Sequence, residues 1–103
     1  MKVIKVTKDN FQEIVLKSKI PVIIDFNADW CGPCKMLGPI LENVANSLDN
    51  IKFVSVNIDD EDDLAAEYSI FSIPCLVYIK DGKEVKRNVG LLSKTELEKF
   101  IED

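Results

Sequence analysis

The pattern of apolar and polar residues along the chain predicts nine elements, each recognisable by its period. Short runs rich in Val, Ile and Phe are typical of strands, whereas apolar residues that recur every three or four positions indicate one face of a helix. Strand patterns occupy residues 3–6, 22–27, 51–58, 75–80 and 84–89. Helix patterns cover residues 11–16, 36–48, 64–68 and 97–101. The predicted order of elements is therefore β-α-β-α-β-α-β-β-α.

This order predicts an α/β fold with a mixed central five-stranded sheet flanked by four helices. Strands joined by a helix normally lie parallel and cross over in a right-handed sense, which applies to the first half of the chain. Asp81-Gly82 is a two-residue hairpin signal, so the last two strands are expected to be antiparallel. With 103 residues, the chain is expected to form a single domain over residues 1–103.

Two helix starts carry the capping-box pattern, in which a small polar residue is followed three positions later by Glu or Gln. Ser93 and Glu96 form this pattern before the last helix. Asn10 and Glu13 form one of two such pairs before the first helix. Both helices are therefore expected to begin with a side-chain cap.

Composition and charge narrow the classes of function. The formal charge of −5 argues against nucleic acid or an anionic membrane as a partner. No apolar run approaches the roughly 18 residues that a membrane span needs, and the first ten residues lack the apolar core of a signal peptide. We therefore expect a soluble cytoplasmic protein. The chain has three cysteines, an odd number that is too small for a disulfide framework, so the sequence argues against cysteines that serve only as structural cross-links.

Two of these cysteines stand in the segment Asp-Trp-Cys-Gly-Pro-Cys-Lys at positions 29–35. Cys31 and Cys34 lie where a buried strand ends and a helix begins. Free backbone N–H groups and the helix dipole favour negative charge there, so they should stabilise a thiolate. A zinc site is the alternative for such a pair. Zinc normally takes four Cys or His ligands, and this chain has no His and only one further Cys, so we expect a thiol–disulfide site and no metal.

Other parts of the chain fit the same interpretation. Trp-Cys-Gly-Pro-Cys-Lys at 30–35 is preceded by Asp25-Phe26 and followed by Ile73-Pro74 and Val89-Gly90. This set closely resembles the thioredoxin family, in length, element order and motif spacing over the whole chain. The resemblance implies the thioredoxin fold, a cis peptide bond before Pro74 and reduction of protein disulfides. It also implies recharging of the thiols by a thioredoxin reductase.

Four positions depart from what the family usually carries. Thioredoxins usually have a second Trp at the position of Asn27 and a Lys, close to the buried acid, at the position of Ser55. They usually have Thr at the position of Cys75, and Gly at that of Ser72. These departures concern the tuning of the site and its partners and leave the reaction class unchanged.

Three residues are expected to carry the chemistry. Cys31 is the expected nucleophile because it is the more N-terminal thiol, nearest the loop and solvent, and Cys34 is the expected resolving thiol. Asp25 is an acid inside an apolar strand. It is either a structural group satisfied by a hydroxyl or water, or a proton-transfer partner of Cys34. We favour the second reading because perturbed buried acids cluster at functional sites, and we expect desolvation to raise the pKa of Asp25.

Six residues are candidates for contact with a substrate, although each has a plainer structural explanation as core, turn or strand end: Trp30, Gly32, Pro33, Ile73, Pro74 and Gly90. The backbone at Ile73 would lie beside the sulfurs, where an extended substrate can pair with it. Phe71 fits core packing and partner contact equally well.

The sequence thus predicts a protein-disulfide reductase that uses a Cys31–Cys34 disulfide and no metal or organic cofactor. Its expected partners are disulfide-bearing proteins and a thioredoxin reductase, and the chain is expected to be a monomer. Two alternatives stay open: a thioredoxin-like oxidant or isomerase, and a binding module that holds a partner without redox turnover.

Overall fold

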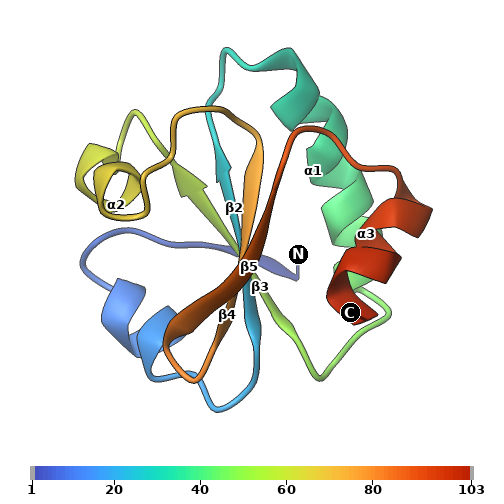
Figure 1. Ribbon diagram of the computed structural model, residues 1–103, viewed down its shortest axis with the longest axis horizontal. Coiled ribbons are helices and arrows are strands. Elements are labelled where there is room, and N and C mark those ends of the chain that lie inside the picture. Colours follow the sequence, from blue (N-terminus) through green and yellow to red (C-terminus); the bar gives the residue numbers. More distant parts are fainter. Residues whose placement is uncertain (1, 103) are drawn as a thin grey trace.

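The computed structural model describes residues 2–102 and contains the predicted order of elements (Figure 1). The strands are β1 (Val3–Lys5), β2 (Val22–Asn27), β3 (Lys52–Asn57), β4 (Cys75–Lys80) and β5 (Lys83–Val89). The helices are η1 (Gln12–Leu16), α1 (Gly32–Ala45), α2 (Asp62–Glu67) and α3 (Lys94–Glu102). Among residues 2–102, no helix has the length and apolar character needed to cross a membrane.

The sheet has the order β1-β3-β2-β4-β5 and is mixed, as predicted. β1, β3 and β2 run parallel, whereas β4 is antiparallel to both β2 and β5. Helices α1 and α3 cover one face of the sheet, and η1 and α2 cover the other (Figure 1). β2 is the central strand, and this places Asp25 directly opposite Ser55 of β3 and Leu76 of β4.

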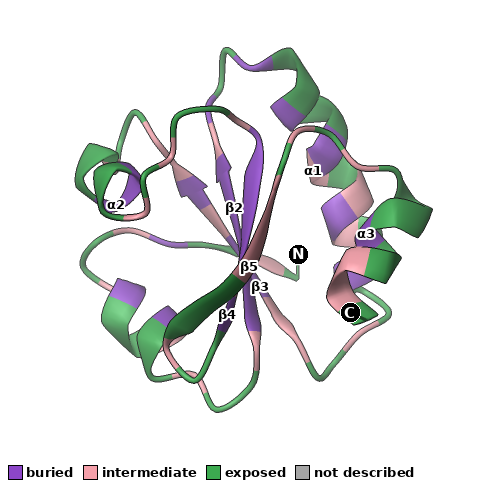
Figure 2. Cartoon of the chain, in the orientation of Figure 1, coloured by how far each residue is buried: buried purple, intermediate pink, exposed green. Residues whose placement is uncertain are grey.

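Each face of the sheet has its own apolar core, because successive side chains of a strand point to opposite faces. Ile24 and Phe26 of β2 pack in the core beneath η1 and α2. Ile23 packs with Leu37 and Leu41 of α1 in the other core. Buried residues are concentrated in the central strands and on the inner sides of the helices (Figure 2). The same alternation places Asp25 and Asn27 on the α1 face, beneath the start of that helix.

The predicted hairpin turn and the predicted cap of the last helix are both present, whereas the predicted cap of the first helix is absent. Asp81 (φ 53°) and Gly82 (φ 79°) form the expected tight hairpin. At α3, the backbone N–H of Ser93 donates to Glu96 (2.9 Å) and that of Glu96 donates to Ser93 Oγ (3.1 Å), which is the predicted capping box. Both capping boxes considered for the first helix are wrong. Asn10 Oδ1 accepts the Thr7 N–H (2.8 Å) and closes a turn, and a short π-helix without a side-chain cap begins after it.

Candidate active site

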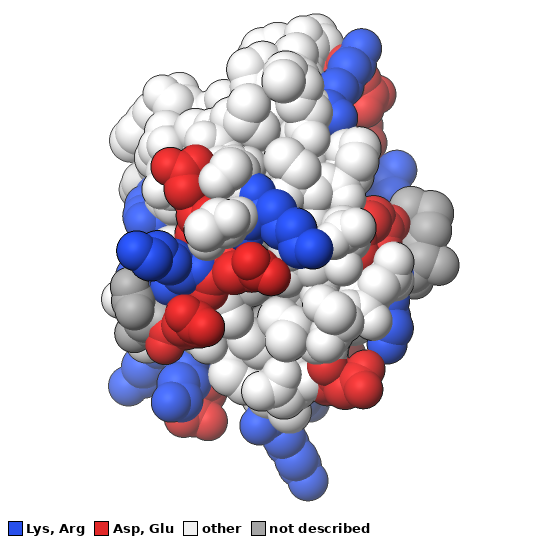
Figure 3. All heavy atoms as spheres, turned by 90° about the vertical axis from the view of Figure 1, so that its right-hand side faces the viewer, with Lys and Arg blue, Asp and Glu red and all other residues white. Residues whose placement is uncertain are grey.

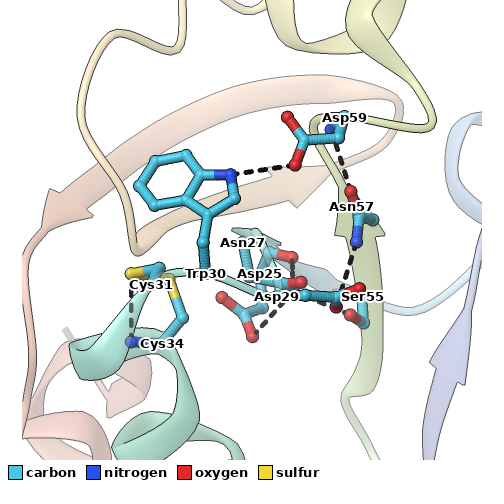
Figure 4. Close-up of a disulfide and its surroundings, with 9 residues drawn as sticks. All are labelled: Asp25, Asn27, Asp29, Trp30, Cys31, Cys34, Ser55, Asn57 and Asp59. Atoms are coloured by element: carbon cyan, nitrogen blue, oxygen red, sulfur yellow. Dashed lines mark hydrogen bonds between the residues drawn. A yellow bond between two sulfur atoms is a disulfide. The ribbon is translucent and has the colours of Figure 1, made fainter.

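The two thiols occupy the junction between β2 and α1, as the sequence predicts. Cys31 is the N-cap of α1, and its Sγ accepts the backbone N–H of Cys34 at 3.2 Å. A disulfide joins Cys31 to Cys34, with 5.2 Å between their Cα atoms (Figure 4). A sulfur held at a helix N-terminus and accepting an N–H is well placed to carry negative charge once the disulfide is reduced.

Exposure to solvent does not distinguish the two cysteines, contrary to the expectation that Cys31 lies nearer the surface. Each is 6% exposed, and the apolar side chains of Ile58 and Ile73 pack against the cluster that the two cysteines form with Ala28. The difference lies in their surroundings. Cys31 receives the helix N–H, whereas Cys34 lines a cavity that Asp25 also lines.

Asp25 is 5% exposed and is the one charged residue in the core of residues 2–102. Desolvation raises its pKa from the ordinary value of 3.8 to about 7, and a hydrogen bond from Asn27 opposes this rise. The direction of the shift is the one expected from the apolar strand around it. Asp25 Oδ1 is buried and has no hydrogen-bond partner among the protein groups of residues 2–102.

Asn27 bonds to the carboxyl group of Asp25, and Ser55 accepts a hydrogen bond from Asn27; the sequence identified both residues only as departures from the family. Asn27 Nδ2 donates to Asp25 Oδ2 (3.3 Å), to the Asp25 carbonyl (2.9 Å) and to Ser55 Oγ (2.8 Å) (Figure 4). One oxygen of the acid thus accepts an amide N–H, whereas the structural alternative considered from the sequence named a hydroxyl or water. The contact between the side chains of Asn27 and Asp25 could have been predicted from the sequence, because residues two positions apart in a strand point to the same face.

Trp30 lies on the surface, so the core explanation for this residue is wrong. Its side chain is 68% exposed, and Nε1 donates to Asp59 Oδ2 at 2.9 Å. Asn57 Oδ1 accepts the Asp59 N–H at 2.8 Å and fixes this residue in turn. Asp59 thus ties the tryptophan beside the disulfide to the end of β3.

The remaining candidates meet at the same end of the sheet. The Ile73–Pro74 peptide bond is cis, as the resemblance implies. Gly90 lies beside it, because its N–H donates to the Pro74 carbonyl at 2.8 Å, and its φ of +105° is one that favours glycine. Gly32 and Pro33 form the first turn of α1. Phe71 is 93% exposed, which excludes the core explanation for it.

A comparison with known families gives a match to the thioredoxin model over residues 2–103. The chain belongs to the thioredoxin family. It is 41% identical over 100 residues to the thioredoxin of Haemophilus influenzae, an alignment that covers 96% of this chain and 94% of that protein. It is 47% identical over 96 residues to the thioredoxin of Chlamydia trachomatis, with 93% and 92% covered. Thioredoxins are protein-disulfide oxidoreductases, and the Cys31–Cys34 disulfide stands at the position of their redox-active pair.

Proposed function

We propose that this chain reduces protein disulfides by dithiol–disulfide exchange, with Cys31 as the nucleophile and Cys34 as the resolving thiol. The observation that carries the proposal is the disulfide at the start of α1, in which Cys31 Sγ also accepts a backbone N–H. This hydrogen bond favours the thiolate of Cys31 in the reduced protein, and the thiolate is the form that attacks a disulfide.

The reaction proceeds in two exchanges. The Cys31 thiolate attacks one sulfur of the substrate disulfide, forms a mixed disulfide and releases the other substrate sulfur as a thiolate. Cys34 then gives up its proton and attacks Cys31 Sγ. The second substrate sulfur leaves, the substrate gains two electrons, and the Cys31–Cys34 disulfide is restored. A thioredoxin reductase supplies two electrons to reduce it again.

Asp25 is the proposed acceptor of the Cys34 proton. Its pKa of about 7 means that it holds and releases a proton near neutral pH, as a general base should. Asp25 and Cys34 line the same cavity, and Asp25 Oδ1 is free of other protein donors within residues 2–102. These three observations favour a catalytic role for Asp25 over a purely structural one.

The proposed substrate contacts surround the disulfide: Trp30, Gly32, Pro33, Ile73, Pro74 and Gly90. The exposed indole of Trp30 offers apolar area on one side. On the other side, Ile73 packs against the cluster of Ala28, Cys31 and Cys34 and forms the cis peptide bond with Pro74. An extended peptide can pair with the backbone there while its disulfide meets Cys31.

We further propose that the protein is a cytoplasmic monomer that needs no metal or organic cofactor and binds neither nucleic acid nor membranes. The net charge of −5 supports the last point. On the face that carries α1 and α3, positive and negative side chains lie intermixed (Figure 3). The buried free thiol of Cys75 fits a reducing compartment.

The Cys34→Ser variant tests this function. It should capture disulfide-bearing proteins as stable mixed disulfides through Cys31, because the resolving attack is gone. Adding Cys75→Ser should leave capture unchanged, and adding Cys31→Ser should abolish it. Capture through Cys75, or no capture by the single variant, would refute the assignment.

The double variant Cys31→Ser/Cys34→Ser separates the reductase from a binding module. A reductase loses its activity with the two thiols, whereas a module that only holds a partner keeps its partner.

A further inference from the structure

Exposed aromatic side chains are confined to one edge of the sheet. The five Phe, two Tyr and one Trp of the chain all lie within residues 2–102, and of these only Trp30 and Phe71 are exposed. Trp30 precedes the disulfide, whereas Phe71 lies in the segment between α2 and β4. Cys75, the first residue of β4, pairs with Phe26 near the end of β2, so this segment and the start of α1 lie at the same edge of the sheet (Figure 1).

The segment that carries Phe71 is anchored on both sides of this residue. Ile70 packs against the core beneath η1 and α2, and its backbone N–H donates to the Ala65 carbonyl at 2.9 Å. Ile73 packs against the same core and against the apolar cluster around the disulfide. Phe71 and Ser72, which lie between these two isoleucines, are exposed. The ring of Phe71 therefore projects into solvent from a short segment whose two ends are held by packing.

Arg87 of β5 provides a further anchor where this segment begins. Its guanidinium donates to the carbonyl groups of Tyr68 (2.7 Å) and Ser69 (3.5 Å), at the end of α2. The same group donates to both carboxyl oxygens of Glu84, at 2.6 and 2.8 Å, which fixes its plane. A contact group that is held in place before binding loses little conformational freedom on binding, so its contact contributes more to affinity.

Phe71 extends the surface that we propose for protein substrates. The side chain is 93% exposed, so almost its whole apolar area is available to a partner. Aromatic residues are enriched where proteins contact partners, because a rigid ring supplies a large apolar area at low cost in conformational entropy. Phe71 stands two residues before Ile73, so their Cα atoms are at most about 7 Å apart. An extended peptide that pairs with the backbone at Ile73 covers this distance in about two residues.

We propose that Phe71 is a specificity-determining residue: it binds an apolar side chain that a disulfide-bearing substrate protein carries about two residues from its reacting cysteine. The protein therefore prefers disulfides in apolar segments to those in polar segments. This inference rests on the proposed function, because the occupant is a substrate of that reaction. The contact lies away from the reacting sulfurs, so it strengthens binding of the substrate and of the transition state equally. It lowers the half-saturating substrate concentration and leaves the maximal rate unchanged.

Two symmetric peptide disulfides are matched probes of this preference. Each consists of two identical chains joined by one disulfide, with either Leu or Ser at the second residue on each side of the cysteine. The reduced protein, without a reductase, is mixed with excess peptide, and the peptide thiol released in a single turnover is measured by chromatography after an acid quench. The half-saturating concentration of the Leu peptide should be about tenfold below that of the Ser peptide, because the Leu side chain and the Phe71 ring bury apolar area together.

Substitutions of Phe71 test whether this residue is the cause. Phe71→Ser should raise the half-saturating concentration of the Leu peptide about tenfold and leave that of the Ser peptide unchanged. Phe71→Leu, which keeps an apolar side chain, should retain most of the preference. Val85→Ser is the control, since Val85 is also exposed but lies five residues before Gly90, roughly 16 Å along β5 from the disulfide edge of the sheet. It should keep the full preference.

The outcomes separate this inference from the function on which it rests. The urea midpoint of Phe71→Ser should equal that of the wild type, so that a lost preference does not reflect a lost fold. Equal use of the two peptides by the wild type, or a preference that survives in Phe71→Ser, would overturn the inference and keep the reductase. Dimerisation that Phe71→Ser abolishes, together with equal use of the peptides, would place a second copy of the chain on Phe71 and overturn it as well. Reduction of neither peptide would refute the proposed function itself.

Discussion

Replacing Asp25 with Asn should remove a pH-dependent loss of stability from the protein. Burial raises the pKa of Asp25 from 3.8 to about 7 in the native state. The native protein therefore binds this proton more tightly than the unfolded chain does. As the pH rises from about 4 to 7, the unfolded chain loses the proton first, so the free energy of unfolding falls across this window and levels off above it.

The size of the effect follows from the two pKa values. A difference of one pH unit corresponds to about 1.36 kcal/mol, so the interval from 3.8 to about 7 corresponds to a loss on the order of 4 kcal/mol. Asn cannot ionise, so the variant should escape this loss. The exchange also changes the hydrogen bonds with Asn27, and the part of that change that depends on the ionisation of Asp25 is already contained in its pKa of about 7. The informative quantity is therefore the change in unfolding free energy between pH 4 and pH 8, compared between the two proteins.

Urea unfolding of the oxidised protein, followed by circular dichroism at both pH values, measures this quantity. Between pH 4 and pH 8, the wild type should lose about 4 kcal/mol more than Asp25→Asn does. Asp9→Asn, which changes an exposed carboxyl group, should behave like the wild type. A difference between wild type and Asp25→Asn below about 1 kcal/mol would mean that the native protein does not desolvate this carboxyl.

Three further outcomes are expected. The Asp25→Asn variant should release mixed disulfides more slowly than the wild type in single-turnover assays, because the base for the Cys34 proton is missing; normal turnover would remove Asp25 from the mechanism. Fluorescence of Trp30, the single Trp of the chain, should rise on reduction with dithiothreitol, because a neighbouring disulfide quenches indole emission; unchanged emission would show that the indole is not close to the sulfurs. Alkylation of the reduced native protein should modify Cys31 first and Cys75 last, because Cys75 is 1% exposed and burial raises the pKa of its thiol. Rapid labelling of Cys75, read by peptide mass spectrometry, would contradict this order.

The sheet was predictable because each strand carries its own local signal. β2 and β4 are rich in β-branched and other apolar residues, and the hairpin between β4 and β5 needs residues that adopt positive φ, which Asp81 and Gly82 supply. The start of the first helix was not predictable from the same kind of signal. Asn10 has two ways to use its side-chain oxygen, as a helix cap or as the acceptor of the Thr7 N–H, and both fit the local sequence.

The chemistry of the site was predictable and its polar surroundings were not. A Cys-Gly-Pro-Cys segment between a strand and a helix identifies the thiols within one stretch of chain. The contacts of Asn27 with Ser55, and of Trp30 with Asp59, join residues 28 and 29 positions apart. They depend on the register of β3 against β2 and on the path of the chain after β3, which no local pattern specifies.

The neutral partners of Asp25 link its raised pKa to the cavity beside it. A cation in contact with this carboxylate would favour the charged form and lower the pKa. Asn27 supplies an uncharged donor, at 3.3 Å, and its effect is smaller than that of desolvation. The pKa therefore remains near the pH at which a proton acceptor works best. The side chains of Asn27 and Ser55 are also short, and this leaves the space between the sheet and α1. The small neutral residues at positions 27 and 55 thus leave the desolvation of Asp25 without an opposing cation, and they leave the space beside it open.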